Sequence, residues 1–81
     1  MSDHGHSLHA EFPDAQAALA ELKTGNAHFR TLAERYHELA QEIFRIEAGL
    51  QASSDERLET LKKQRLAILD EIAAMLPAKA A

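Results

Sequence analysis

The sequence contains no cysteine and no tryptophan, and only two prolines and three glycines among its 81 residues. The absence of cysteine excludes disulfide bonds and thiolate metal sites. A chain this short buries a smaller fraction of its surface than a mid-sized domain does, so its core needs additional support. The sources of support that remain are close helix packing, self-association, or a metal site built from histidines and carboxylates.

Long apolar runs are also missing, because no stretch of the chain approaches the roughly 20 apolar residues that a membrane span needs. The beginning, "MSDHGHSLHAEF", is polar and carries acidic residues in place of the basic and apolar regions of a signal peptide. We therefore expect a soluble, cytoplasmic protein.

Positive charge is in the minority, with 9 lysines and arginines against 13 acidic residues and a net charge of -4. A nucleic-acid-binding domain normally carries a dominant basic field. The one basic cluster, Lys62, Lys63 and Arg65, is more typical of a solvated helix face. We therefore do not expect nucleic acid as a partner.

Apolar residues at helical spacing predict a short first helix over residues 14–23. Pro13 is tolerated where a helix begins, and Asp14 is a good N-cap or first-turn residue. Gly25 and Asn26 are expected to end this helix, and Asn26 can cap the next one.

A second, longer helix is predicted over residues 27–49 by a regular apolar seam. Its positions alternate at spacings of three and four residues, which keeps one face toward a partner helix. The seam consists of Phe29, Leu32, Tyr36, Leu39, Ile43, Ile46 and Leu50.

A third helix is predicted over residues 55–75, with Ser53 and Glu56 forming a capping box at its start. Its apolar face is wider than one partner helix requires, because it carries a seam and a second stripe. The seam is Leu58, Leu61, Arg65, Ile68, Ile72 and Met75, and the stripe is Leu66, Leu69, Ala73 and Leu76.

Arg65 is the one charged residue on that seam, and two interpretations of it remain open. The guanidinium can pair with Glu38 or Glu42 of the second helix and so fix the register of the two helices. Alternatively, the side chain lays its aliphatic stem over the seam and extends its charged head into water.

The short connection near residue 53 makes the second and third helices antiparallel neighbours. The predicted fold class is therefore all-α: an antiparallel, coiled-coil-like helical hairpin with a short N-terminal helix beside it. We expect one domain over residues 10–76, preceded by a flexible histidine-containing leader over residues 1–9 and followed by a frayed tail over residues 77–81.

Several segments together resemble the YdcH-like family of small bacterial proteins, a domain family of unknown function. The segments are "EFP" (11–13), "HF" (28–29), "YHEL" (36–39), "RIE" (45–47), "LKKQRL" (61–66) and "DEI" (70–72). One departure is Leu69, which stands where the family usually has a lysine. The resemblance implies a helical hairpin or coiled coil and implies no activity, cofactor or binding residue.

The leader holds three of the five histidines, His4, His6 and His9. Imidazoles are suitable ligands for zinc, copper and nickel. If Met1 is removed, the new amino terminus and His4 can together chelate copper or nickel, but this chelation needs no folded protein. We favour a polar tail that happens to contain histidines, and a metal site is the alternative.

No nucleophile elbow, phosphate loop or zinc-protease helix occurs in the sequence, and two or three short helices enclose little volume for a pocket. We therefore expect a non-enzymatic protein without a cofactor, acting in protein–protein interaction or self-association through apolar helix faces. The candidate interface residues are Leu66, Leu69, Leu76, Phe44 and Tyr36, although core packing is the favoured role of Tyr36.

Overall fold

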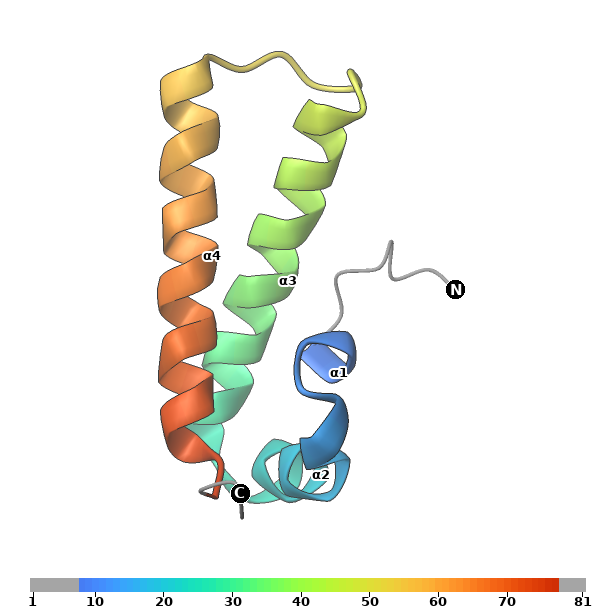
Figure 1. The fold of residues 1–81 in the computed structure, drawn as a ribbon, viewed down its shortest axis with the longest axis vertical. Coiled ribbons are helices and arrows are strands. Elements are labelled where there is room, and N and C mark those ends of the chain that lie inside the picture. Colours follow the sequence, from blue (N-terminus) through green and yellow to red (C-terminus); the bar gives the residue numbers. More distant parts are fainter. Residues whose placement is uncertain (1–7, 78–81) are drawn as a thin grey trace.

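The structure is a computed structural model, and it describes residues 8–77. A four-residue helix α1 (Leu8–Glu11) leads through a 3-10 turn η1 (Pro13–Ala15) into α2 (Gln16–Gly25). Two longer helices, α3 (Ala27–Glu47) and α4 (Asp55–Met75), follow and lie antiparallel (Figure 1). The described residues contain no strand, so the predicted all-α hairpin with a short N-terminal helix is confirmed.

Local capping fixes where the two long helices begin. The side chain of Asn26 accepts a hydrogen bond of 2.8 Å from the backbone N–H of Phe29, as the sequence predicts. The predicted capping box of Ser53 and Glu56 is wrong, because the N-cap of α4 is Ser54, whose Oγ accepts from the Arg57 N–H at 3.0 Å. The predicted bounds of α4 are nevertheless those observed.

The end of α3 differs from the prediction by two residues. The helix ends at Glu47, and Gly49 then adopts a φ of +79°, a conformation that costs glycine little. The chain consequently turns away before Leu50, which is 71% exposed. Leu50 is therefore not a seam residue, because the helical repeat that would carry it inward has already stopped.

Part of the predicted leader lies in a helix. Leu8 and His9, which the sequence analysis assigns to the leader, lie in α1, and Leu8 is only 5% exposed. The predicted first helix over residues 14–23 is observed as η1 followed by α2, which ends at Gly25. The remainder of the predicted leader and most of the predicted tail lie outside the described residues.

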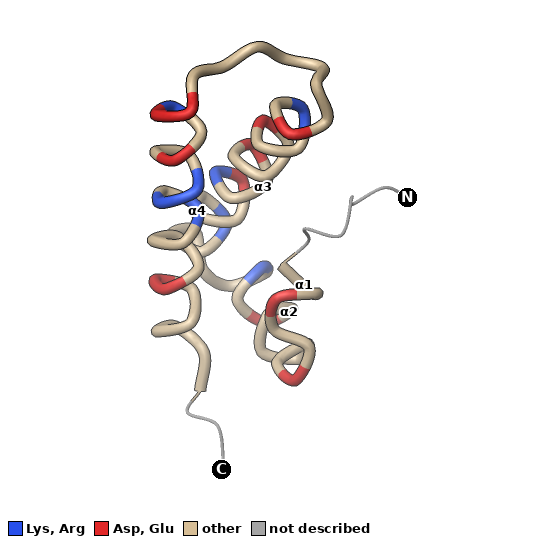
Figure 2. Tube along the Cα trace, turned by 45° about the horizontal axis from the view of Figure 1, so that its top comes forward, with Lys and Arg blue, Asp and Glu red and all other residues tan. Residues whose placement is uncertain are grey.

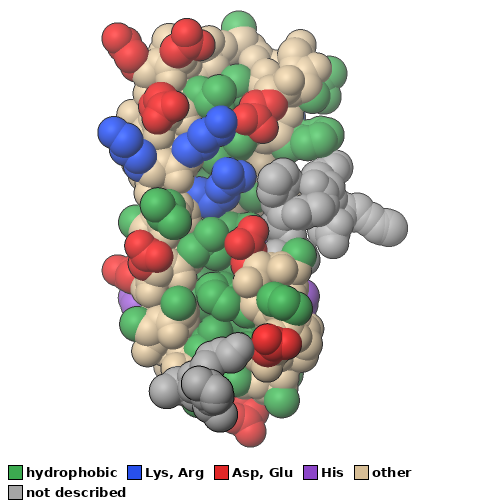
Figure 3. Space-filling model, in the orientation of Figure 1, with side chains coloured by type: hydrophobic (Ala, Val, Ile, Leu, Met, Phe, Trp, Pro, Cys, Tyr) green, Lys and Arg blue, Asp and Glu red, His purple; other side chains and the backbone are tan. Residues whose placement is uncertain are grey.

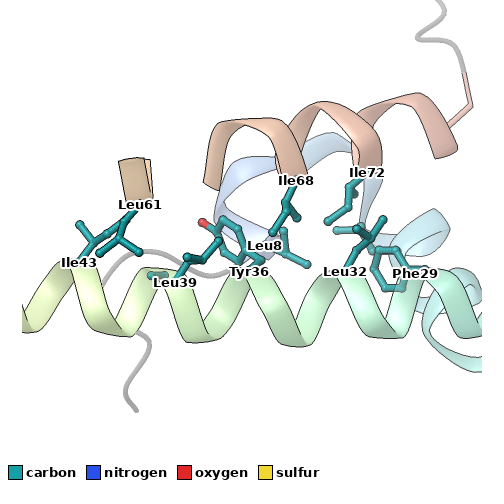
Figure 4. Packing of buried hydrophobic residues seen from close by; sticks show 11 residues of the cluster. Leu8, Phe29, Leu32, Tyr36, Leu39, Ile43, Leu61, Ile68 and Ile72 are labelled. Carbon is teal, nitrogen blue, oxygen red and sulfur yellow. The ribbon is translucent and has the colours of Figure 1, made fainter. Parts of the chain in front are cut away.

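The core lies between α3 and α4, with contributions from α1 and α2. Figure 4 shows Leu8 of α1 beside Tyr36 of α3 and Ile68 of α4. The buried apolar residues are Leu8, Leu19, Phe29, Leu32, Tyr36, Leu39, Ala40, Ile43, Leu61, Ile68 and Ile72. Six of the seven predicted seam positions of α3 are buried or pack against this cluster. None of the helices in the described part of the chain is long and apolar enough to cross a membrane.

Candidate interaction surface and a buried polar centre

The predicted second stripe of α4 faces the N-terminal segment along part of its length. We call Leu66, Leu69, Ala73 and Leu76 the α4 stripe. Leu69 and Leu76 are half-buried and pack against the core, whereas Leu66 is 59% exposed. Leu69 and Leu76 are thus partly covered, whereas Leu66 and Ala73 of the same stripe are exposed.

A hollow of about 470 Å³ lies at the covered end of the stripe. Ala73, Leu76 and Pro77 line it on one side, and residues 11–15 line it on the other. Hydrophobic side chains gather along the middle of this face, between α4 and the N-terminal elements (Figure 3). The last turn of α4, residues 72–75, carries no charged residue, so the hollow opens beside an apolar helix end (Figure 2).

The other two interface candidates lie in different surroundings. Tyr36 is fully buried, with 0% of its surface exposed, and it presents nothing to a partner while the helices stay packed. Phe44 is half-buried on α3, toward the loop end of the hairpin. The structure therefore brings Leu66, Leu69 and Leu76 together on one helix and leaves Phe44 and Tyr36 outside that group.

A buried polar centre, which the sequence analysis did not predict, lies among three elements. The hydroxyl of Tyr36 on α3 and Nη1 of Arg65 on α4 are both buried, and neither has a hydrogen-bond partner of good geometry. Burial raises the pKa of Tyr36 above its usual 10.0, the nearby charge of Glu11 on α1 raises it further, and Arg65 lowers it. Tyr36 therefore keeps its hydroxyl proton at ordinary pH.

Arg65 matches neither of its two predicted roles. Glu42 pairs instead with Arg57 at 2.8 Å, and Glu38 pairs with Arg35 at 3.6 Å. One guanidinium nitrogen of Arg65 is buried, so its head does not lie wholly in water. The charge of Arg65 instead lies near enough to Tyr36 to lower the pKa of its hydroxyl.

Polar contacts at the loop end of the hairpin form a small network around Glu42. Its carboxylate accepts from Arg57 at 2.8 Å and from the Gln51 amide at 3.2 Å, and these hydrogen bonds hold the pKa of Glu42 below 4.5. Lys62, from the basic cluster, pairs with Glu47 at 2.8 Å. Part of that cluster is thus engaged within the hairpin.

The predicted metal ligands can be followed only in part. His4 and His6 lie outside the described residues. His9 lies on α1, where a ring nitrogen is hydrogen-bonded to the Gln16 side chain. Within residues 8–77, no three histidine, aspartate or glutamate side chains come together in a way that could hold a metal ion.

Comparison with known proteins gives one match. The model of a family described as "Protein of unknown function (DUF465)" matches residues 29–76, which span all but the first two residues of α3, the whole of α4 and the turn between them. No curated protein and no solved structure matches the chain.

Proposed function

The chain belongs to the DUF465 family of proteins of unknown function, and we propose that it is a non-enzymatic module that binds another α-helix through the α4 stripe. The earlier resemblance to YdcH-like proteins is compatible with this membership. The simplest partner is a second copy of the same chain, because each copy supplies the same stripe and a twofold pairing brings the two together.

The observation that carries the proposal is the exposure of Leu66. A leucine with 59% of its surface in water lies next to half-buried Leu69, in a stripe with spacings of three, four and three residues. That spacing is the pattern by which one helix packs against another. Isolated exposed leucines are common, but Leu66 differs from them because it continues the spacing of the rest of the stripe.

The size of the stripe sets the expected affinity. Residues 66–76 span roughly 15 Å of helix, so a pair of such stripes forms a small interface. Small interfaces are typical of weak or transient association. We therefore expect reversible dimers with a dissociation constant in the micromolar range or weaker.

Sedimentation velocity over a wide range of protein concentrations tests the proposal. The natural chain is expected to shift from monomer to dimer as concentration rises, and Leu66→Lys is expected to remain monomeric. Ala67→Lys is the matched control, because it adds the same charge at the neighbouring exposed position. If Leu66→Lys and Ala67→Lys change association equally, the α4 stripe is not the interface.

If the natural chain stays monomeric at every concentration, the proposal of self-association is wrong. Cross-linking from a photoreactive residue at position 66 in cells then tests for a different protein partner. The helix-binding proposal then stands only if a helix-containing protein is cross-linked to position 66 and not to position 67.

A further inference from the structure

A second hollow, of about 410 Å³, lies on the side of α3 that faces α1 and α2. Its volume falls within the range of about 300–1,000 Å³ that is typical of small-molecule pockets. Its apolar lining comes from all three helices and consists of Leu8, Leu19, Ala20, Phe29 and Ala33. Leu8, Leu19 and Phe29 are themselves buried, so the base of the hollow is continuous with the core.

The polar residues around this hollow are mostly basic or imidazole groups. They are His9, Lys23, Arg30, Glu34 and His37. Two bases against one acid give a local charge of +1 with both histidines neutral, whereas the whole chain carries -4. A positively charged rim around an apolar base is therefore a local exception on an acidic protein.

Hydrogen bonds hold two of these side chains in place. Nη1 of Arg30 donates to the backbone carbonyl of Lys23 at 3.0 Å, which ties α3 to the last turns of α2. The side chain of Gln16 bonds to the His9 ring, and its Nε2 also donates to the His9 carbonyl at 3.1 Å. A rim held in this way loses less conformational entropy when a ligand binds.

We propose that this hollow binds a free medium-chain fatty acid. The alkyl tail lies in the hollow against exposed Ala20 and half-buried Ala33, above the buried Leu8, Leu19 and Phe29, and burial of its methylene groups favours binding. The carboxylate lies at the rim near Lys23 and Arg30, which supply charged hydrogen-bond donors. The site is separate from the α4 stripe, so the proposal stands independently of helix binding.

The first experiment is a titration of the full-length chain with decanoate below its micelle concentration, followed by amide NMR shifts. We expect saturable shifts at residues of α1, α2 and the first half of α3. Affinity should rise by up to about fourfold for each methylene added from hexanoate to decanoate. Decanol, which has the same tail without the charge, should bind about tenfold more weakly than decanoate.

Two matched pairs of variants locate the site. Ala33→Leu fills the hollow and should abolish the shifts, while Ala67→Leu on the exposed side of α4 should preserve them. Lys23→Glu should weaken decanoate binding by about tenfold, while Lys63→Glu, with the same change of net charge, should not. If Ala33→Leu fails to fold by circular dichroism, Ala20→Leu at an exposed lining position replaces it.

Several outcomes overturn the proposal. Absence of saturable shifts with decanoate is one, and equal binding by the hollow-filling variant and its Ala67→Leu control is another. Equal affinity for decanoate and decanol contradicts the role assigned to the basic rim.

Discussion

At the end of the hairpin where α3 begins and α4 finishes, α1, η1 and α2 lie against the two long helices (Figure 1). We call this the covered end. The loop end, by contrast, consists of the second half of α3, the first half of α4 and the connection between them. At the covered end Leu8 and Leu19 join the core, whereas the buried residues of the loop end are Leu39, Ala40, Ile43 and Leu61.

Polar contacts between α3 and α4 are distributed in the opposite way to the apolar burial, because the shorter contacts lie at the loop end. The loop end has the ion pairs of Glu42 with Arg57 and of Glu47 with Lys62, each at 2.8 Å. Nearer the covered end the contacts given by the described residues are longer: Arg35 donates to the Gln64 side chain at 3.4 Å, and exposed His28 lies 3.9 Å from Glu71. Two helices alone cannot enclose a wide apolar face, so the loop end places charged side chains at its margins. A third layer allows the covered end to bury more apolar surface.

The largest expected effect is a difference between two core truncations, one at each end. Ile72→Ala at the covered end should lower the free energy of unfolding by about 3–5 kcal/mol, and Ile43→Ala at the loop end by about 2–3 kcal/mol. Both side chains are 0% exposed, so the difference reflects how far each site can collapse around the cavity. Urea denaturation measures both values. Equal losses of unfolding free energy in the two variants would show that the N-terminal elements do not restrict how far the structure relaxes around the cavity.

A smaller effect of opposite sign is expected at the polar centre between the two ends. Tyr36→Phe removes a buried hydroxyl that lacks a well-formed hydrogen bond, so it should stabilise the protein by about 1 kcal/mol. Tyr36→Leu is the control, because it also removes the ring and should destabilise through a cavity. A loss of stability in Tyr36→Phe would show that the hydroxyl is bonded in solution.

The same residue gives a pH dependence with a definite sign. Because the folded pKa of Tyr36 is raised, its contribution to stability is fully present below pH 10.0 and is lost as pH rises through the folded value. Tyr36 is the only tyrosine in the chain, so tyrosinate absorbance follows its ionisation directly. Ionisation at or below pH 10.0 in the folded protein contradicts the expected direction.

The smallest expected effect concerns the ion pairs of the loop end. The folded pKa of Glu42 is lowered, so its contribution to stability is present above pH 4.5 and is lost as pH falls through the folded value. Glu42→Gln should therefore lower the urea midpoint slightly at neutral pH and not under acidic conditions where Glu42 is protonated. If Glu42→Gln lowered the urea midpoint as much as Ile43→Ala does, polar contacts would contribute most of the stability of the loop end.

The fold could be predicted because its signals are local. The apolar spacing of α4 and the side-chain cap at Asn26 each act through hydrogen bonds and contacts within one or two helical turns. The two errors are also local. The predicted end of α3 is two residues too late, and the predicted N-cap of α4 is one residue too early. The exposure of Leu50 follows directly from the first of them.

The candidate surfaces were predictable only as lists of residues. Leu66, Leu69 and Leu76 are equivalent leucines in the sequence, but in the fold Leu69 and Leu76 are half-buried and Leu66 is exposed. The hollow between α1, α2 and α3 needs residues of all three helices together, and no spacing within one segment reveals it.

The all-α class, the hairpin and the order of the helices follow from the amino-acid sequence alone, because helical periodicity and capping depend on residues a few positions apart. Packing across the whole chain, by contrast, places Leu8 in the core and leaves Arg65 near Tyr36 without either expected glutamate. It also decides which part of the α4 stripe stays open. These features depend on which distant segment covers a given face, and that choice is made by packing across the whole chain.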